Sequence, residues 1–268
     1  MRFSPLFTLL SFVACDIQIE AGDVIREDRA VEAFSRIEAS GMLDVEVDVG
    51  GPEAVSIVCG EHVLDDIITE VDNSNTLNIR LREGGRWTGI GSCEVHVRVP
   101  ELTYASAQGS GNLDIDGATS TFATLFSEGS GRVIVTGTAM ALEQIRGVGS
   151  GGVKVEGIDS RTLVVGLEGS GDVELSGRAN VVDLGVDGSG DVDAMDLTTV
   201  DADVRLVGSG SVSLTVTGAA DVTLTGSGDV ELRGNPQVTS NVSGSGNVSV
   251  NYRFRASYLA RIKTIGIQ

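Results

Sequence analysis

The stretch Gly169-Ser170-Gly171-Asp172-Val173-Glu174-Leu175-Ser176-Gly177 decides the fold, because its pattern recurs along half of the chain. It opens with a Gly-Ser-Gly tripeptide, and the residues four and six places after the first glycine are apolar. The tripeptide occurs eight times at intervals of 18 to 20 residues, and its first glycines are Gly109, Gly129, Gly149, Gly169, Gly188, Gly208, Gly226 and Gly244. A period this constant marks a repeat architecture.

Each repeat contains two strand-like segments. After the tripeptide, all sixteen residues at the two apolar positions are hydrophobic, and most residues beside them are polar, so the period is two. Before most tripeptides a second alternating segment appears, as in Leu163, Val165 and Leu167. A period of two predicts a strand with one buried face. Each repeat is therefore predicted to be two strands that meet at a Gly-Ser-Gly corner.

Two all-β architectures fit a repeat of two strands. In an antiparallel meander, neighbouring strands run in opposite directions. In a parallel β-solenoid, each repeat is one coil of about 18–20 residues, and equivalent residues stack into aliphatic columns with glycine ladders at the corners. Glycine suits such a corner because a Cβ there would recur against the next layer. We predict the solenoid, and we expect its coils to be right-handed.

Composition narrows the functional classes. The 268 residues include 19 Lys and Arg against 38 Asp and Glu, so the net charge is −19. This balance argues against binding to nucleic acid or to an anionic membrane surface, which require basic residues. The 41% hydrophobic content is enough for a packed core.

The chain is predicted to divide into five parts. They are a signal peptide over residues 1–14, a tether over 15–33, a β-rich N-terminal cap over 34–108, the Gly-Ser-Gly solenoid over 109–250, and a C-terminal cap or disordered tail over 251–268. The cap region alternates in several short segments that lack the tripeptide, so it is either a cap or a set of coils with irregular corners. Because the open end of a solenoid exposes strand edges, a cap is expected there.

The N-terminus has the pattern of an export signal. One arginine, Arg2, precedes an apolar run that is too short to cross a bilayer. The run ends in Phe12-Val13-Ala14-Cys15, which resembles a bacterial lipoprotein lipobox. We therefore expect Cys15 to carry lipid and to anchor the protein to a membrane of the bacterial cell envelope. Secretion without lipid and a cytosolic location are the alternatives.

Cys59 and Cys93 form an even pair once Cys15 is set aside. In an oxidising compartment they are candidates for a disulfide, and two free buried thiols are the alternative. A metal site is not expected, because the only histidines are His62 and His96 and no Cys-x-x-Cys spacing occurs. No cofactor is expected.

One loop and the tail are candidate contact regions. Arg82, Arg86 and Trp87 lie in or beside a glycine-rich loop and are candidates for a partner contact; alternatively, Trp87 folds back over the cap. The segment 251–268 is basic and aromatic, unlike the rest of the chain. It either covers the last coil, docks on the acidic body, or is disordered.

Four features together resemble a known family. They are Phe34-Ser35-Arg36-Ile37-Glu38-Ala39-Ser40-Gly41, the strand over 43–49, the segment over 63–70, and the Gly-Ser-Gly series. They resemble the putative auto-transporter adhesin head, GIN domain family, over about residues 30–250. The resemblance implies a β-solenoid of the bacterial envelope, often lipid-anchored or secreted.

Three classes of function remain. The first is a non-catalytic envelope module that adheres to an envelope protein or a surface glycan. The second is an enzyme that acts on polysaccharide, since parallel β-helices support such chemistry. Its site would need a concentrated group of acids, bases and aromatic residues, whereas the acids here recur along the coils. The third is a structural or stress-related envelope protein. We expect the first, and no catalytic residues.

Overall fold

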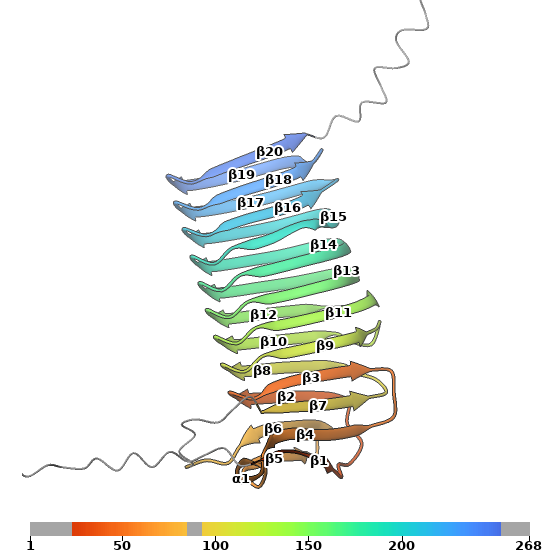
Figure 1. The fold of residues 1–268 in the computed structure, drawn as a ribbon. Helices are drawn as coiled ribbons and strands as arrows, with labels where there is room; N and C mark the ends of the chain where they lie inside the picture. The colour runs from red at the N-terminus through yellow and green to blue at the C-terminus, as the bar shows by residue number, and fades with distance from the viewer. Residues whose placement is uncertain (1–22, 85–92, 253–268) are drawn as a thin grey trace, which may run out of the picture.

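A computed structural model describes residues 23–84 and 93–252. These residues form a parallel β-solenoid, as the sequence predicted, with coils of about 20 residues. Figure 1 shows the coils stacked along one axis, with the first strands at one end and β20 at the other. Each coil contributes one strand to each of two stacked parallel sheets, and the aliphatic core lies between the sheets.

The first sheet contains the strands that precede the glycine corners. Its short members are β2 (Arg36–Gly41), β8 (Tyr104–Gly109), β10 (Thr124–Gly129), β12 (Gln144–Gly149), β17 (Ala219–Gly226) and β19 (Gln237–Gly244), together with β6 (Thr76–Leu81), which has no glycine corner and pairs in parallel with β2. The second sheet contains the strands that follow these corners. Its short members are β3 (Asp44–Val49), β7 (Glu94–Val99), β9 (Leu113–Ala118), β11 (Val133–Met140), β16 (Ser211–Val216), β18 (Asp229–Gly234) and β20 (Asn247–Tyr252).

Three long strands belong to both sheets. They are β13 (Val153–Gly169), β14 (Val173–Gly188) and β15 (Val192–Gly208). The first half of each pairs in the second sheet, and the other half pairs in the first sheet. In this middle part of the molecule the second corner of each coil is therefore a bend within one strand.

The register of the coils explains the sequence pattern. Val173 stacks on Val153, and Gly169 stacks on Gly149. The alternating aliphatic residues point inward and are almost fully buried, as at Leu184 and Val204, which have no exposed surface. Branched aliphatic side chains thus form continuous columns, because the same position is repeated in every layer.

The glycine corner is a hydrogen-bonded unit. The carbonyl oxygen of Gly149 accepts the N–H groups of both Ser170 and Gly171 in the next coil, at 2.9 and 3.1 Å. Gly169 has a φ of +121°, and a Cβ on it would strike the Gly149 carbonyl oxygen. Only glycine meets both requirements. The positive φ and the close carbonyl oxygen recur at each tripeptide, and both N–H groups donate at all of them except Gly208–Gly210, where only Ser209 N donates to the Gly188 carbonyl oxygen.

The N-terminal region contains a coil out of sequence order. β2 pairs with β6 (Thr76–Leu81) on one side and with β8 on the other, and β3 pairs with β7 and β9. The coil made by β2 and β3 therefore lies between two segments that follow it in the chain. Part of the region 34–108 that we predicted as a cap is thus a regular coil, built on a corner at Gly41 instead of a full Gly-Ser-Gly.

Antiparallel strands and a short helix close this end of the solenoid. β4 (Ala54–Gly60) pairs with β7 and with β1 (Val24–Arg29), and β5 (Ile67–Val71) pairs with β6, all antiparallel. The helix α1 (Glu61–Leu64) follows β4. Because β1 lies within 15–33, the cap begins earlier than the predicted tether allowed. At the other end, β20 extends the solenoid to Tyr252.

Candidate functional site

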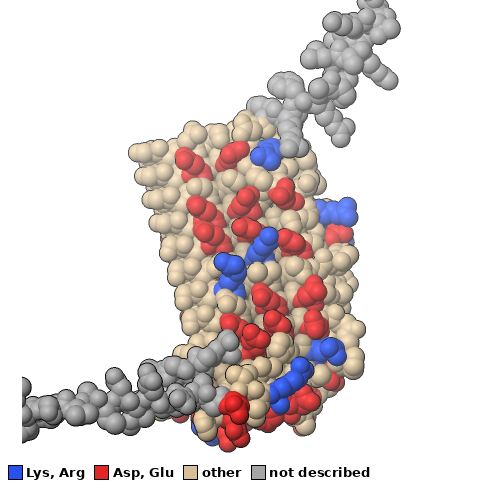
Figure 2. Space-filling model, viewed as in Figure 1, with Lys and Arg blue, Asp and Glu red and all other residues tan. Residues whose placement is uncertain are grey.

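The second sheet presents a strongly acidic outer face. Its outward carboxylates, which are exposed or partly exposed, are Asp44, Glu46, Asp48, Glu94, Asp114, Asp116, Glu156, Asp172, Glu174, Asp191, Asp193, Asp196, Asp229 and Glu231. We call this set the acidic face. Figure 2 shows Asp and Glu side chains in rows across the coils, interrupted by a few Lys and Arg. Since each coil adds the same positions, the charge is spread along the solenoid instead of gathering in one cleft.

Part of this acidity has a structural role. The residue that follows Gly-Ser-Gly often carries a side-chain oxygen that accepts the backbone N–H of the equivalent residue in the next coil. Asp191 Oδ1 accepts from Ser211 N at 2.7 Å, and Asp44 Oδ1 accepts from Asn112 N at 2.8 Å. Asn112 Oδ1 continues the series by accepting from Arg132 N at 3.0 Å. These side chains satisfy backbone donors at the start of the second-sheet strands.

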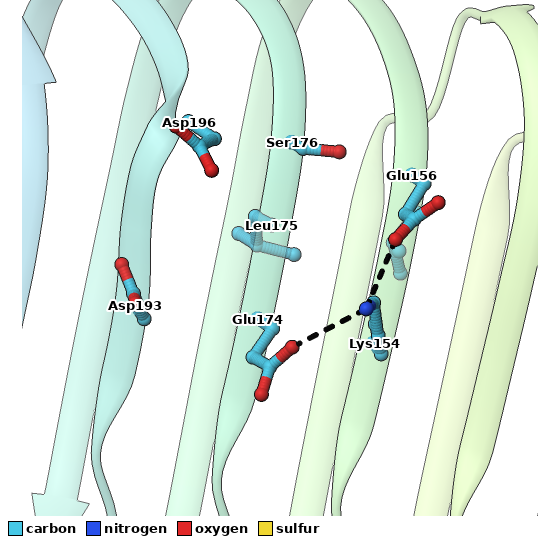
Figure 3. Close-up of a pocket in the computed structure, with 8 residues that line it drawn as sticks. Lys154, Glu156, Glu174, Leu175, Ser176, Asp193 and Asp196 are labelled. Atoms are coloured by element: carbon cyan, nitrogen blue, oxygen red, sulfur yellow. Dashed lines mark ion pairs between the residues drawn. The ribbon is translucent and has the colours of Figure 1, made fainter.

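A shallow hollow on the acidic face surrounds Lys154 (Figure 3). Its Nζ lies 3.0 Å from Glu156 Oε1 and 3.7 Å from Glu174 Oε2, and Asp193 and Asp196 line the same hollow. The hydrogen bond and the charge of Glu156, followed by the charge of Glu174, raise the pKa of Lys154. The lysine therefore remains a cation, because its neighbours stabilise the protonated form and do not prepare it to act as a base.

Asp114 lies on the acidic face beside two other carboxylates, Glu46 and Asp44. Partial desolvation, followed by the neighbouring charges of Glu46 and Asp44, raises the pKa of Asp114, while Arg132 opposes the shift. A raised carboxyl pKa means that the ionised form is disfavoured in the folded protein. Asp114 therefore opposes folding at neutral pH, and this cost disappears as the pH falls through its folded-state pKa.

The outer face of the first sheet carries a small aromatic group that the sequence analysis missed. The guanidinium of Arg36 lies 3.9 Å from the ring centre of Tyr104, and the Tyr104 and Phe126 ring centres are 5.9 Å apart. Arg36 Nε also donates to Thr76 Oγ1 at 3.3 Å. The three side chains come from β2, β8 and β10, which are neighbours in space. Only the out-of-order coil brings Arg36 to Tyr104, so sequence spacing carried no signal for this pair.

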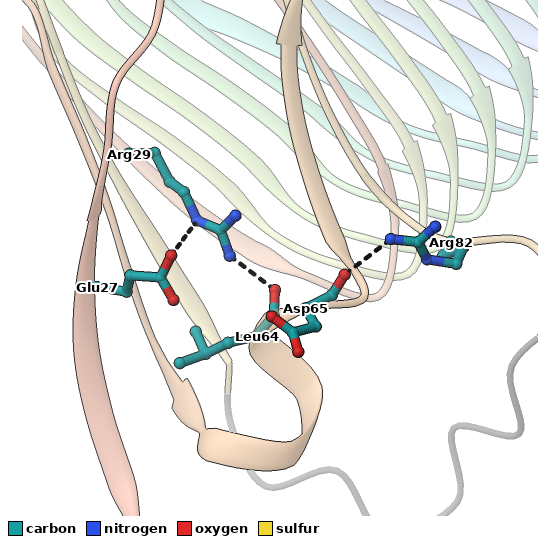
Figure 4. A network of polar contacts seen from close by, with 5 residues as sticks. All are labelled: Glu27, Arg29, Leu64, Asp65 and Arg82. Atoms are coloured by element: carbon teal, nitrogen blue, oxygen red, sulfur yellow. Dashed lines mark hydrogen bonds and ion pairs between the residues drawn. The ribbon is translucent and has the colours of Figure 1, made fainter.

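The predicted contact residue Arg82 lies at the capped end. It donates from Nη2 to the carbonyl oxygen of Asp65 at 3.0 Å, and its Nε lies 3.3 Å from Asp66 Oδ1. Figure 4 shows it beside a second group in which Arg29 contacts Glu27 and the carbonyl oxygen of Leu64. Arg82 therefore holds the end of β6 against the turn after α1. Arg86 and Trp87 lie outside the described residues.

The three cysteines occupy different regions. Cys59 in β4 and Cys93 just before β7 are joined by a disulfide, with their Cα atoms 4.5 Å apart. Both side chains are buried in the cap, where β4 and β7 pair. Cys15 lies outside the described residues. The disulfide ties the residue that precedes β7 to β4.

A metal site and a membrane-spanning helix each have requirements that can be compared with the described residues. Across residues 23–84 and 93–252, no three His, Cys, Asp or Glu side chains converge in a way that would hold a metal ion. In the same ranges, no helix has the length and hydrophobicity needed to cross a membrane.

Comparison with known proteins identifies the family. The sequence profile of the family described as "Putative auto-transporter adhesin, head GIN domain" matches residues 33–236, which is more than half of the chain. The chain belongs to this family. Family membership agrees with the resemblance seen in the sequence and indicates a surface or envelope protein with an adhesin-like head. Among curated proteins, none matches this GIN-domain chain.

Solved structures share the fold of this GIN-domain chain. A putative lipid binding protein from Parabacteroides distasonis is 24% identical and superposes with a TM-score of 0.75, over 87% of this chain and 98% of its own. A putative adhesin from Parabacteroides merdae is 18% identical with a TM-score of 0.75, over 86% and 97% of the two chains. A putative adhesin from Bacteroides fragilis is 22% identical with a TM-score of 0.65, over 85% and 97%. At these identities the likeness establishes the fold alone.

Proposed function

We propose that this protein is a non-catalytic adhesive or interaction module, held at the bacterial cell envelope by lipid on Cys15. The observation that best supports this proposal is that the coils stack into two extended sheets, one of which carries carboxylates on its outer face from β3 to β18. Solenoids offer such extended surfaces for binding. The family supports an adhesin-like role, and three of its fold relatives have names that refer to adhesion or lipid binding.

The distribution of titratable groups supports the absence of catalysis in this proposal. General acid–base chemistry uses a few groups with perturbed pKa values that converge on a substrate. Within residues 23–84 and 93–252, the residues with raised pKa values are Asp114 and Lys154, which lie on the open acidic face, and the shift of Lys154 strengthens its charged form. The acidic face therefore suits recognition of a partner better than proton transfer.

The loop between β6 and β7 is the proposed contact region, since Arg86 and Trp87 lie in it. Its two ends are held in place, at Arg82 by the contacts with Asp65 and Asp66 and at Cys93 by the disulfide. Tryptophan and arginine are enriched among the residues that contribute most to binding at protein interfaces. An envelope protein or a surface glycan is the proposed partner.

Replacing Cys15 with serine is expected to release the protein from membranes. A thioether-linked or amide-linked acyl chain needs this cysteine, and each buried CH₂ of an acyl chain contributes about 0.8 kcal/mol to membrane binding. The measurement is fractionation of cells that produce the full chain, with immunoblots of the membrane and soluble fractions. Ser11→Ala, a change within the same segment, is the control and is expected to remain in the membrane fraction. Equal membrane association of Cys15→Ser and the parent would contradict the anchor.

Replacing Trp87 with alanine is expected to weaken partner binding at least about tenfold, as for an interface hot spot. The full chain carrying Cys15→Ser is immobilised on beads. The beads are incubated separately with detergent-solubilised envelope proteins and with glycans released from the same envelopes. Retained species are quantified by mass spectrometry, and affinities follow from titrating the recovered species.

Arg178→Ala provides the matched control for Arg86→Ala and Trp87→Ala. Arg178 is exposed on β14 and pairs only with Asp159 among the described residues, at 3.2 Å, so its loss is expected to leave binding unchanged. Equal recovery by all variants would remove the loop from the interface. Failure of the parent to retain any protein or glycan would contradict the adhesive module itself.

A further inference from the structure

The two ends of the solenoid differ. At the N-terminal end, β1, β4, β5 and α1 cover the first coils. At the C-terminal end, within the described residues 23–84 and 93–252, β19 pairs only with β17 and β20 pairs only with β18. The outer edges of β19 and β20 thus present backbone N–H and C=O groups that a further layer would satisfy. We call this surface the open end.

Inward-facing side chains at the open end are only partly covered. Val242 stacks on Leu224 of the previous coil, yet Val242 is 42% exposed whereas Leu224 is 0% exposed. Val248 and Val250 are likewise only partly buried, although Val230 beneath Val248 is fully buried. Unpaired edges that carry apolar side chains favour association with another strand or chain. A further segment or chain that paired with these edges and covered the valine side chains would therefore stabilise the open end.

The chain that follows β20 has the composition of such an occupant. Residues 253–268 follow directly from the last strand, and 16 residues approach the 18 to 20 of one coil. Their large apolar or aromatic side chains are Phe254, Tyr258, Leu259, Ile262, Ile265 and Ile267. At about 3.3 Å per extended residue, the segment spans roughly 50 Å, longer than any strand of the open end.

Charge also distinguishes this segment from the body. It contains four basic residues, Arg253, Arg255, Arg261 and Lys263, and no acidic residue, whereas the whole chain has a net charge of −19. Asp229 and Glu231 of β18 lie one layer below β20 on the acidic face. A basic segment that lies on this end is attracted by those carboxylates. The segment has no Asp or Glu side chain that they would repel.

We propose that residues 253–268 fold back over the open end, pack their apolar side chains on Val238, Val242, Val248 and Val250, and occupy the outer edge of β19. Covalent connection to β20 gives this segment a high effective concentration at the surface, an advantage that a second copy or an outside partner lacks. The segment then serves as the counterpart of the antiparallel cap at the other end. This inference is independent of the proposed adhesive function.

The test measures hydrogen–deuterium exchange of the β19 amides in the full chain carrying Cys15→Ser. Ile262→Asp places a charge among the packed apolar side chains and is expected to accelerate exchange over residues 237–244 at least about tenfold. Thr264→Asp makes the same change of charge at a polar position of the segment and is expected to leave exchange within about twofold of the parent. Exchange over β13 and β14 reports whether each variant is folded.

Four results would overturn the proposal. The first is rapid exchange of β19 in the parent, and the second is an equal effect of the two variants. The third is β19 protection that rises with protein concentration together with a dimer mass in light scattering, which would make a second copy the occupant. The fourth is protection that appears only when vesicles of anionic phospholipid are added, which would assign the segment to a membrane surface.

Discussion

Gly169→Ala is expected to lower the free energy of unfolding by about 2 to 4 kcal/mol. Two costs combine at this corner. The φ of +121° is one that side-chain-bearing residues rarely adopt, and the new Cβ would strike the carbonyl oxygen of Gly149. That oxygen already accepts N–H groups from Ser170 and Gly171, so it cannot move away without weakening both hydrogen bonds.

Gly166→Ala is the matched control on the same strand. Gly166 also lies in β13, but its φ is not positive, and a Cβ there would meet nothing within 4 Å. Alanine at such a site is expected to be neutral or to stabilise by about 0.4–1 kcal/mol, because it restricts the unfolded chain. Urea unfolding of both variants, followed by circular dichroism, measures the difference. Equal destabilisation by the two substitutions would show that the stacked corner is not what requires glycine.

Loss of the Cys59–Cys93 disulfide is expected to destabilise the capped end by about 3 to 4 kcal/mol. The bond links residues 34 apart in sequence, and closing a loop of this size removes much of the entropy of the unfolded chain. Its place matters as well. It ties β4 to the start of β7, and these two strands connect the antiparallel cap to the parallel coils.

The double variant Cys59→Ala and Cys93→Ala removes the bond without burying a new polar group. Its urea midpoint is expected to fall, whereas the parent treated with a reducing agent should match the variant closely. Alkylation of denatured, unreduced parent protein, followed by mass spectrometry, is expected to find neither Cys59 nor Cys93 modified. Two alkylated cysteines in the parent, or an unchanged midpoint in the variant, would contradict the prediction.

Several features of the candidate site were beyond the reach of sequence patterns. The Arg36, Tyr104 and Phe126 group forms because β2 lies against β8, although 68 residues separate Arg36 from Tyr104. The role of Asp191 as an acceptor for Ser211 N was also hidden, because an exposed aspartate in a repeat equally fits a solvated face. Both features depend on contacts between neighbouring coils. A repeat period predicts which residues of neighbouring coils are in contact only where the repeat is regular.

The sequence by itself determined the coil. Eight Gly-Ser-Gly tripeptides at near-constant spacing, each followed by alternating aliphatic residues, are compatible with a stack of two-strand coils, because each layer repeats the same steric and hydrophobic demand. The tertiary structure alone decided where the coil of β2 and β3 lies, which strands close one end, and which edges stay open at the other. These outcomes depend on long-range pairing among short irregular strands, where local alternation fits several partners equally well and only the packed core selects one of them.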